Sequence, residues 1–247
     1  MIKRFLITIE YDGANYSGWQ RQKNGLAVQQ VLEEGLEAVL GEPITVFGSS
    51  RTDAGVCASA QTAHFDSRTR IAPERIPFAV NGVLPKDISV KKCVETAPDF
   101  HARFSNKIKT YVYRLYVSEV RRPLYDAYAF WQKKPLDIAA MRRAAGVMEG
   151  TYDCKCFQRA GSPSGDTVKT IYSVTVGELS DGRLDITVSG GGFLYKMVRT
   201  MAGTLLYAGL GKLSKEDILQ AIKSGDAAKT GKTLPPEFLC LTGTEYI

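Results

Sequence analysis

The chain has 247 residues, of which 44% are hydrophobic, and a formal net charge of +6. These values are typical of a globular protein with a sizeable core, in one large domain or two small ones. No apolar run approaches the length of a membrane span, and the run from Phe5 to Ile9 is too short for a signal peptide. Five scattered cysteines and only two histidines fit a reducing compartment and argue against a zinc site. We therefore expect a cytoplasmic protein with no membrane association and no metal.

The first half of the chain predicts alternating strands and helices. Period-2 alternation predicts a strand over residues 3–11, and apolar residues at helical spacing predict an amphipathic helix over 28–40. Further strands are expected at 44–49, 61–66 and 87–95, with a short helix from Pro73 to about Val83. The polar loop over 12–27 carries aromatic and basic residues that either contact RNA or simply pack, namely Tyr16, Trp19, Arg21 and Lys23.

The second half repeats this order. Its predicted elements are a strand over 109–118, a helix over 138–148, a hairpin of 168–178 with 184–189, helices over 193–207 and 214–223, and a strand over 239–246. Each half therefore has the order β-α-β-β-α-β, which is the split βαβ or ferredoxin-like arrangement. We predict an α+β fold with an N-terminal half over 1–107, which carries the Asp53 loop, and a C-terminal half over 108–247.

A small, polar stretch from Gly48 to Phe65 joins two predicted strands of the first half. It places one cation, Arg51, and one anion, Asp53, on either side of Thr52. A carboxylate beside a guanidinium stays ionised at neutral pH, which suits nucleophilic or electrostatic work better than general-acid catalysis. The alternative is an aspartate that only hydrogen-bonds its own turn.

The same stretch carries a family resemblance. The run Arg51-Thr52-Asp53-Ala54-Gly55-Val56, followed by Ala58, Gln61, His64 and Phe65, resembles the active-site signature of the tRNA pseudouridine synthase A-type family. The chain departs from that pattern at Ser50, where the family usually has glycine, and at Cys57, where it usually has histidine. The resemblance implies that Asp53 is the catalytic residue and that Arg51 supports it.

Two further blocks, at about residues 99–116 and 191–206, resemble the same family. Tyr111 matches its active-site tyrosine, whose ring stacks on the target base, and Arg103 matches a residue that contacts the RNA. Arg199 matches an arginine that would pair with Asp53. Leu194 belongs to a run that would line the pocket. Without the resemblance, Arg199 is interpreted as a solvated cation on a helix.

A basic segment lies between His101 and Tyr125. Its only anion is Glu119, and its cations are Arg103, Lys107, Lys109, Arg114, Arg121 and Arg122. Such a cluster is expected of a phosphate-binding surface, although a solvated strand face is the alternative. We predict that Arg103, Lys107 and Lys109 bind the substrate.

The resemblance implies an enzyme that isomerises specific uridines of tRNA to pseudouridine in the anticodon stem-loop, without a cofactor. It also implies a homodimer that shares one tRNA, and two halves whose mostly antiparallel sheets join with a cleft between them. Departures from the family pattern leave another RNA position or substrate open, and they fall at Cys57, Tyr152, Cys154 and Phe238. One alternative is a non-catalytic RNA-binding protein. A metal-dependent nuclease is less favoured, because Asp53 has no acidic neighbour in the sequence closer than Asp66.

Overall fold

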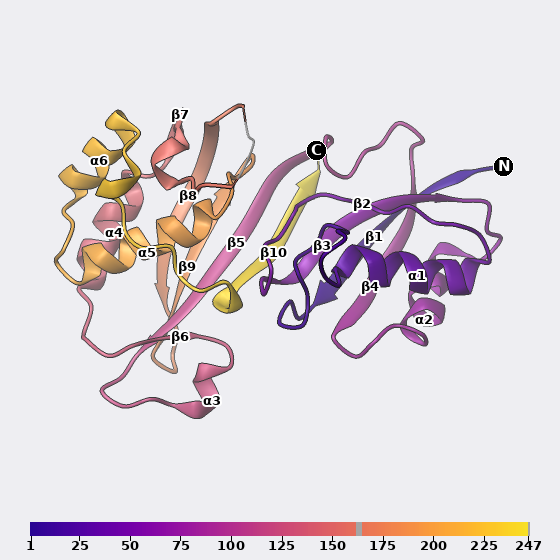
Figure 1. Cartoon of the computed structure of the whole chain (residues 1–247), viewed down its shortest axis with the longest axis horizontal. Helices are drawn as coiled ribbons and strands as arrows, with labels where there is room; N and C mark the ends of the chain where they lie inside the picture. Colours follow the sequence, from indigo (N-terminus) through magenta and orange to yellow (C-terminus); the bar gives the residue numbers. More distant parts are fainter. Residues whose placement is uncertain (162–164, 247) are drawn as a thin grey trace. The chain divides into compact units, whose positions relative to one another are not determined.

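The computed structural model describes residues 1–161 and 165–246, which form two compact units (Figure 1). The first unit contains Met1–Lys107 together with the C-terminal residues from Cys240, and the second contains Ile108–Leu239. Each unit combines helices with mostly antiparallel strands, so the predicted α+β class is confirmed. The division into an N-terminal domain over 1–107 and a C-terminal domain over 108–247 stays a prediction.

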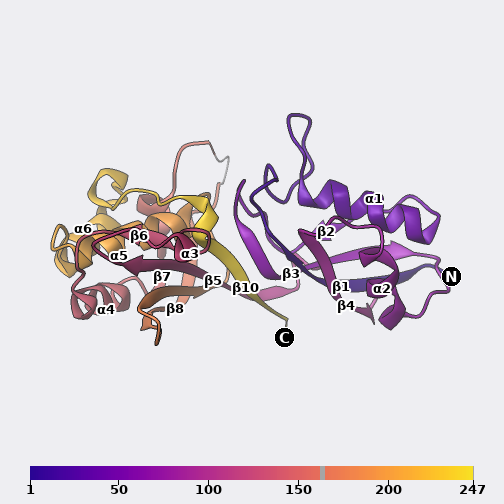
Figure 2. The same ribbon diagram turned by 90° about the horizontal axis from the view of Figure 1, so that it is seen from below.

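The first unit has the strand order of a split βαβ fold. Its strands run in the order β4-β1-β3, and both β2 and β10 pair with β3. Every pairing is antiparallel except that of β10 with β3. Figure 2 shows α1 running alongside these strands. The elements are β1 (Lys3–Tyr11), α1 (Val28–Leu40), β2 (Phe47–Gly48), β3 (Cys57–Ser67), a 3-10 turn (Pro73–Arg75), α2 (Ile76–Asn81), β4 (Ile88–Thr96) and β10 (Leu239–Tyr246).

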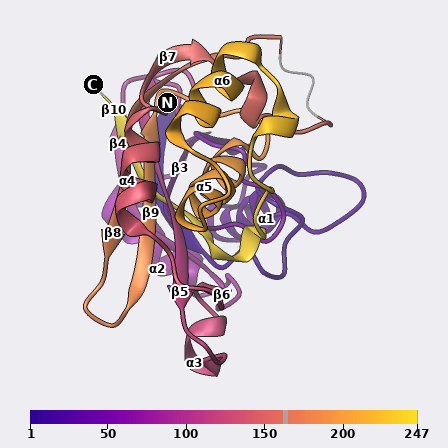
Figure 3. The same ribbon diagram turned by 90° about the vertical axis from the view of Figure 1, so that its left-hand side faces the viewer.

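The second unit has its helices beside an antiparallel sheet of order β5-β9-β8-β7, with the short β6 added parallel to β5. Helices α4, α5 and α6 gather together, and α4 contacts β8 (Figure 3). The elements are β5 (Asn106–Val117), α3 (Pro123–Asp126), β6 (Phe130–Gln132), α4 (Ile138–Gly146), β7 (Gly150–Asp153), β8 (Val168–Glu178), β9 (Arg183–Gly190), α5 (Met197–Gly209) and α6 (Lys215–Ser224). Single 3-10 turns occur at Cys154–Phe157, Ala227–Lys229 and Pro236–Phe238.

Binary patterning explains the regular elements. In β1 the side chains of Phe5, Ile7 and Ile9 are almost fully buried, while the residues between them are more exposed. Phe5 stacks on Phe65 of β3, with 5.4 Å between the ring centroids. Gly41 ends α1 in the left-handed conformation, at φ 71°, which glycine adopts without steric cost.

Two predicted elements differ from the structure. The predicted strand over 44–49 is reduced to Phe47–Gly48, because the N–H groups of Ile44 and Val46 bond to glutamate side chains of α1. The helix predicted from residue 193 begins only at Met197, because Lys196 has a left-handed backbone at φ 59°. Residues 191–196 are therefore a loop before the helix, and the loop begins with two glycines that follow Gly190 at the end of β9.

No helix among residues 1–161 and 165–246 combines the length and the apolar character that crossing a membrane requires. Cys93, Cys154 and Cys156 are buried free thiols.

Candidate active site

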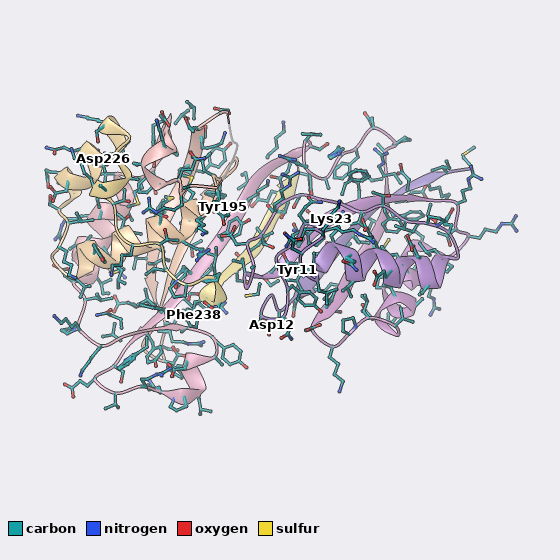
Figure 4. All side chains as sticks on the ribbon, viewed as in Figure 1. Tyr11, Asp12, Lys23, Tyr195, Asp226 and Phe238 are labelled. Atoms are coloured by element: carbon teal, nitrogen blue, oxygen red, sulfur yellow. The ribbon has the colours of Figure 1, made fainter. Side chains whose placement is uncertain are left out.

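The loop that carries Asp53, residues 49–56, is held by hydrogen bonds to the polar loop that follows β1. The hydroxyl groups of Tyr11 and Thr52 lie 2.7 Å apart, and the N–H of Trp19 donates to the carbonyl of Thr52 at 3.2 Å. The N–H of Gly55 donates in turn to the carbonyl of Tyr16. Tyr11 stands at the end of β1, where it is labelled in Figure 4. Both loops therefore move as one piece with the sheet.

Glycines let the two loops approach each other. A Cβ atom on Gly13 would lie 2.2 Å from the carbonyl oxygen of Val56, and one on Gly18 would lie 2.6 Å from that of Thr52. Gly18 also has φ 95°, which strains any other residue. Nothing local in the sequence identifies these two positions as supports of Asp53, because the contact joins segments far apart in the chain.

The start of the loop is fixed from the β3 side. The N–H of Ser49 donates to the carbonyl of Thr62, and its hydroxyl donates to the side chain of Gln61 at 2.9 Å. The amide of Gln61 then donates to the carbonyl of Ser50 at 2.8 Å. Arg51 is exposed and Asp53 is partly exposed, so a fixed backbone presents both side chains at the surface of the loop.

The aromatic residues of the 12–27 loop pack and are not available to RNA. Trp19 is 1% exposed and Tyr16 is 6% exposed. The hydroxyl of Tyr16 donates to Asp87 at 2.6 Å, and Arg21 is paired with Glu33 at 2.9 Å. Of the two interpretations that the sequence leaves open, packing holds for both rings.

The second unit holds the other candidate residues. Tyr111 lies on β5, is 7% exposed, and meets the ring of Phe193 edge to face at 5.4 Å. A Cβ on Gly190, which ends β9, would lie 3.1 Å from that phenylalanine ring, so glycine leaves room for it. Leu194 is 6% exposed in the same loop. Tyr111 and Leu194 are therefore both buried in this unit, and Tyr111 contacts the residue that precedes Leu194.

Arg199 is a buried cation on α5. Its side chain is 9% exposed, and its Nε donates to the carbonyl of Leu234 at 2.7 Å. A solvated helix cation would be exposed, so that alternative does not hold. The pairing of Arg199 with Asp53 stays a prediction.

Several cations of the basic segment make intramolecular contacts. Arg114 is paired with Asp185, Arg121 is paired with Asp126, and Arg122 lies 3.8 Å above the ring of Tyr125. Arg103 and Lys107 are exposed, Lys109 is partly exposed, and Arg121 and Arg122 are exposed as well. Exposed cations therefore occur at both ends of the segment.

The departures from the family pattern are packed within their own units. Cys57 of β3 lies opposite Cys240 of β10, and Cys154 is fully buried. The hydroxyl of Tyr152 donates to the carbonyl of Met148 at 2.6 Å. The ring of Phe238, labelled in Figure 4, meets Tyr113 and Phe130 edge to face.

Among the described residues, no three His, Cys, Asp or Glu side chains gather as a metal site would require. A nuclease that relies on clustered carboxylates therefore finds no support in this part of the chain.

The family profile described as tRNA pseudouridine synthase matches residues 7–105 and 144–246. The chain belongs to the tRNA pseudouridine synthase family. It is 40% identical to the tRNA pseudouridine synthase A of Thermoanaerobacter sp. and 42% identical to that of Ruminiclostridium cellulolyticum. Each match covers 99% of this chain and 100% of the relative. The tRNA pseudouridine synthase A 2 of Clostridium perfringens is 41% identical over the same shares.

Among solved structures, the chain is similar to one described as the crystal structure of a Cbf5-Nop10-Gar1 complex. That match has 12% identity and a TM-score of 0.37, and it covers 96% of this chain and 48% of the other. At this TM-score the likeness carries no argument. Family membership therefore rests on the sequence, and the roles of Arg51, Asp53, Tyr111 and Arg199 stay predictions.

Proposed function

We propose that this protein converts specific uridines of tRNA to pseudouridine, with Asp53 as its catalytic residue. The observation that carries the proposal is the place of Asp53 in a family signature, on a loop whose backbone is fixed while its side chain is partly exposed. Catalysis requires such positioning, because a displacement of about 1 Å costs about 100-fold in rate.

The reaction sets out what the site must do. The bond between C1′ and N1 breaks, the uracil turns, C5 joins C1′, the hydrogen on C5 leaves as a proton, and N1 takes up a proton. The product is an isomer of the substrate, so the balance requires no cofactor. Asp53 acts near C1′ by one of three routes, which are attack on C1′, attack on the base, or removal of a sugar proton.

The remaining site residues hold the flipped uridine, orient Asp53 and bind the RNA phosphates. A stacked uridine must leave its helix to reach a carboxylate, so the enzyme flips the nucleotide. Tyr111 stacks on the flipped base, and Leu194 lines its pocket. Arg51 and Arg199 favour the ionised form of Asp53 and orient it, since a guanidinium can hold a carboxylate through two hydrogen bonds. Arg103, Lys107 and Lys109 bind phosphates.

The substrate region and the assembly are further parts of the proposal. We place the modified uridines in the anticodon stem-loop of tRNA and the enzyme in the cytoplasm. Two copies of the chain share one tRNA. The motive for the dimer, beyond the resemblance, is that the basic segment between His101 and Tyr125 is too short to span a tRNA alone.

The variant Asp53→Asn separates chemistry from binding. It keeps the size of the side chain but removes its charge, so turnover should fall by about three orders of magnitude or more while tRNA still binds through its phosphates. Tritium release from unmodified tRNA labelled at C5 of uridine measures the chemistry directly. Glu74→Gln is the matched control, because Glu74 is an exposed carboxylate of the same unit, and it should keep full activity. Substantial release by a folded, tRNA-binding Asp53→Asn protein would refute the role of Asp53.

The assembly has its own test. Analytical ultracentrifugation should find a dimer at working concentration, and titration with tRNA should saturate at one tRNA for two chains. A fully active monomer, or one tRNA bound by each chain, would contradict the proposed sharing.

The alternative function, RNA binding without catalysis, makes an opposite prediction. A non-catalytic protein would bind tRNA and release no tritium with any tRNA substrate, and Asp53→Asn would change nothing. Mapping of new pseudouridines after incubation of the pure protein with unmodified RNA decides between the two and also locates the modified positions.

A further inference from the structure

A row of aromatic rings in the first unit leads from the core to the surface. The buried ring of His64 on β3 stacks on Phe47 of β2, with 5.0 Å between centroids and 18° between the planes. His101 lies 4.6 Å from His64, and Phe104 lies 4.4 Å from His101. His64 is 2% exposed and Phe104 is 74% exposed. The row therefore ends in a large apolar ring that the fold presents to solvent.

The turn that carries Phe104 is held rigidly. The N–H groups of Phe104 and Ser105 both donate to the carbonyl of His101, and the hydroxyl of Ser105 accepts from the N–H of His101. The N–H of Ala102 donates to Nδ1 of His64 at 3.2 Å, and the hydroxyl of Tyr246 donates to the carbonyl of Ala102 at 3.0 Å. Because the turn is ordered in advance, a partner that stacks on it loses little conformational entropy.

A cation lies beside the exposed ring. The guanidinium of Arg103 lies 5.8 Å from the centroid of Phe104, and Lys107 is exposed in the same stretch. An exposed aromatic ring beside cations matches a nucleotide, whose base is flat and apolar on its faces and whose phosphate is negative. A nucleotide is favoured over a protein partner here because an exposed ring and the guanidinium of Arg103 lie next to each other.

Another phenylalanine of the same unit provides a comparison. Phe78 on α2 is 77% exposed, as much as Phe104. Within the described chain it contacts no ring and no cation, whereas Phe104 contacts both. Exposure alone therefore does not distinguish the two residues, but their surroundings do.

We propose that Phe104, backed by His101 and flanked by Arg103, is a stacking platform for an unpaired base of the RNA substrate outside the uridine pocket. The proposal rests on the proposed function for the identity of the RNA. It adds a second point at which the protein holds a base, on a unit different from that of Tyr111. A platform of this kind favours substrates with an unpaired base at a fixed place relative to the target.

Affinity is the first test, with unmodified tRNA as the probe. Phe104→Ala should weaken binding about fivefold or more, since base–aromatic stacking contributes that much by alanine substitution. Phe104→Trp should keep the affinity, and Phe104→Leu should lose most of it because leucine is apolar but has no flat ring. Phe78→Ala should leave binding and turnover unchanged. Equal affinities for Phe104→Ala and Phe78→Ala would overturn the proposal.

Fluorescence gives a direct readout of stacking. The introduced indole of Phe104→Trp should be quenched when tRNA is added, and that of Phe78→Trp should not be quenched beyond the effect of absorption by the RNA. A stem–loop with abasic sites in place of its unpaired nucleotides should abolish both the quenching and the penalty of Phe104→Ala. If the penalty is the same on the abasic stem–loop, Phe104 does not hold a base.

Salt dependence separates the ring from its cation. Phe104→Ala should leave the slope of log affinity against log salt unchanged, whereas Arg103→Ala should reduce it by about one unit. If Phe104→Ala instead changes the oligomeric state without changing tRNA affinity, the surface is a protein contact and the proposal fails.

These outcomes remain distinguishable from failure of the proposed function. If the wild-type protein binds tRNA without releasing tritium, catalysis is absent while the platform is still tested by affinity and quenching. If tritium is released normally and the two phenylalanines behave alike, the function stands and the platform does not.

Discussion

Two segments that carry candidate residues are held in different ways. The loop over 49–56 in the first unit is fixed mainly through its backbone, by contacts that depend on Gly13 and Gly18 having no side chain. The segment around Arg199 in the second unit is fixed through a side chain, since its guanidinium reaches the carbonyl of Leu234. An added Cβ atom on Gly13 or Gly18 should therefore disrupt the loop over 49–56. Loss of the guanidinium donor should disrupt the segment around Arg199.

The difference has a physical origin. A nucleophile must be placed within tenths of an ångström, and a backbone held by several hydrogen bonds achieves this without restricting the side chain itself. A buried arginine instead needs acceptors for its donors, because an unsatisfied buried charge is strongly destabilising. The exposed side chains of the 49–56 loop therefore tolerate change. In the second unit the backbone of α5 is also closely approached, since a Cβ on Gly203 would lie 1.8 Å from the carbonyl oxygen of Lys232.

The largest expected effect in this comparison is that of Gly13→Ala. The new Cβ would lie 2.2 Å from the carbonyl oxygen of Val56, so the two loops must separate. We expect a loss of about 3 kcal/mol in the free energy of unfolding and about 100-fold lower turnover. The control is Gly146→Ala at the end of α4, where no atom lies within 4 Å. That variant should be neutral or slightly more stable. Urea unfolding and tritium release measure both quantities, and equal results for the two variants would refute the backbone argument.

Arg199→Lys tests the side-chain arrangement. Lysine keeps the charge but has no Nε–H to donate to Leu234, so we expect a loss of about 2 kcal/mol in stability and about tenfold in turnover. Arg142 also donates its Nε to a backbone carbonyl, that of Val176, but its side chain is 53% exposed. Arg142→Lys should therefore cost less than about 0.5 kcal/mol. If Arg199→Lys and Arg142→Lys unfold at the same urea concentration, burial does not determine how much stability is lost with the Nε–H donor.

The smallest effect concerns pH. Burial and the neighbouring His101 and Arg4 lower the pKa of His64 to about 4. Between about pH 6.5 and pH 4, the His64 imidazole is therefore protonated in the unfolded chain but neutral in the folded chain. The free energy of unfolding consequently falls as the pH drops through this range. We expect a loss of between about 1 and 2 kcal/mol from this residue. In the second unit, burial raises the pKa of Asp185, which gives a contribution of the opposite sign.

His64→Asn removes the titration while an amide oxygen can still accept from the N–H of Ala102. Urea unfolding of this variant should be less dependent on pH over the same range. In the wild-type protein, the protection factors for hydrogen exchange should fall between pH 7 and pH 5 more in β3 than in β8. A slope of stability against pH that is the same in the variant and the wild type would show that His64 is not responsible.

Local patterns in the sequence suffice for the regular elements. The alternation of Phe5, Ile7 and Ile9 predicts β1, and the apolar spacing over residues 28–40 predicts α1. Ser214 and Asp217 predict the start of α6, where the structure has the full capping box. In each case the signal lies within a few residues of the element, so it can be interpreted without the fold. The Asp53 loop is likewise identified by a contiguous motif.

The tertiary structure alone decides what depends on distant partners. The sequence predicts that Ile44 and Val46 belong to a strand. Their N–H groups instead donate to glutamate side chains of α1, so the strand is shorter than predicted. Helical spacing alone predicts that Arg199 is a solvated cation, but in the structure its Nε donates to the carbonyl of Leu234. The requirement for glycine at position 18 depends on a distant partner, because a Cβ there would lie 2.6 Å from the carbonyl oxygen of Thr52. Local propensity acts over a few residues, whereas burial and hydrogen-bond partners are set by whichever segment the fold brings into contact.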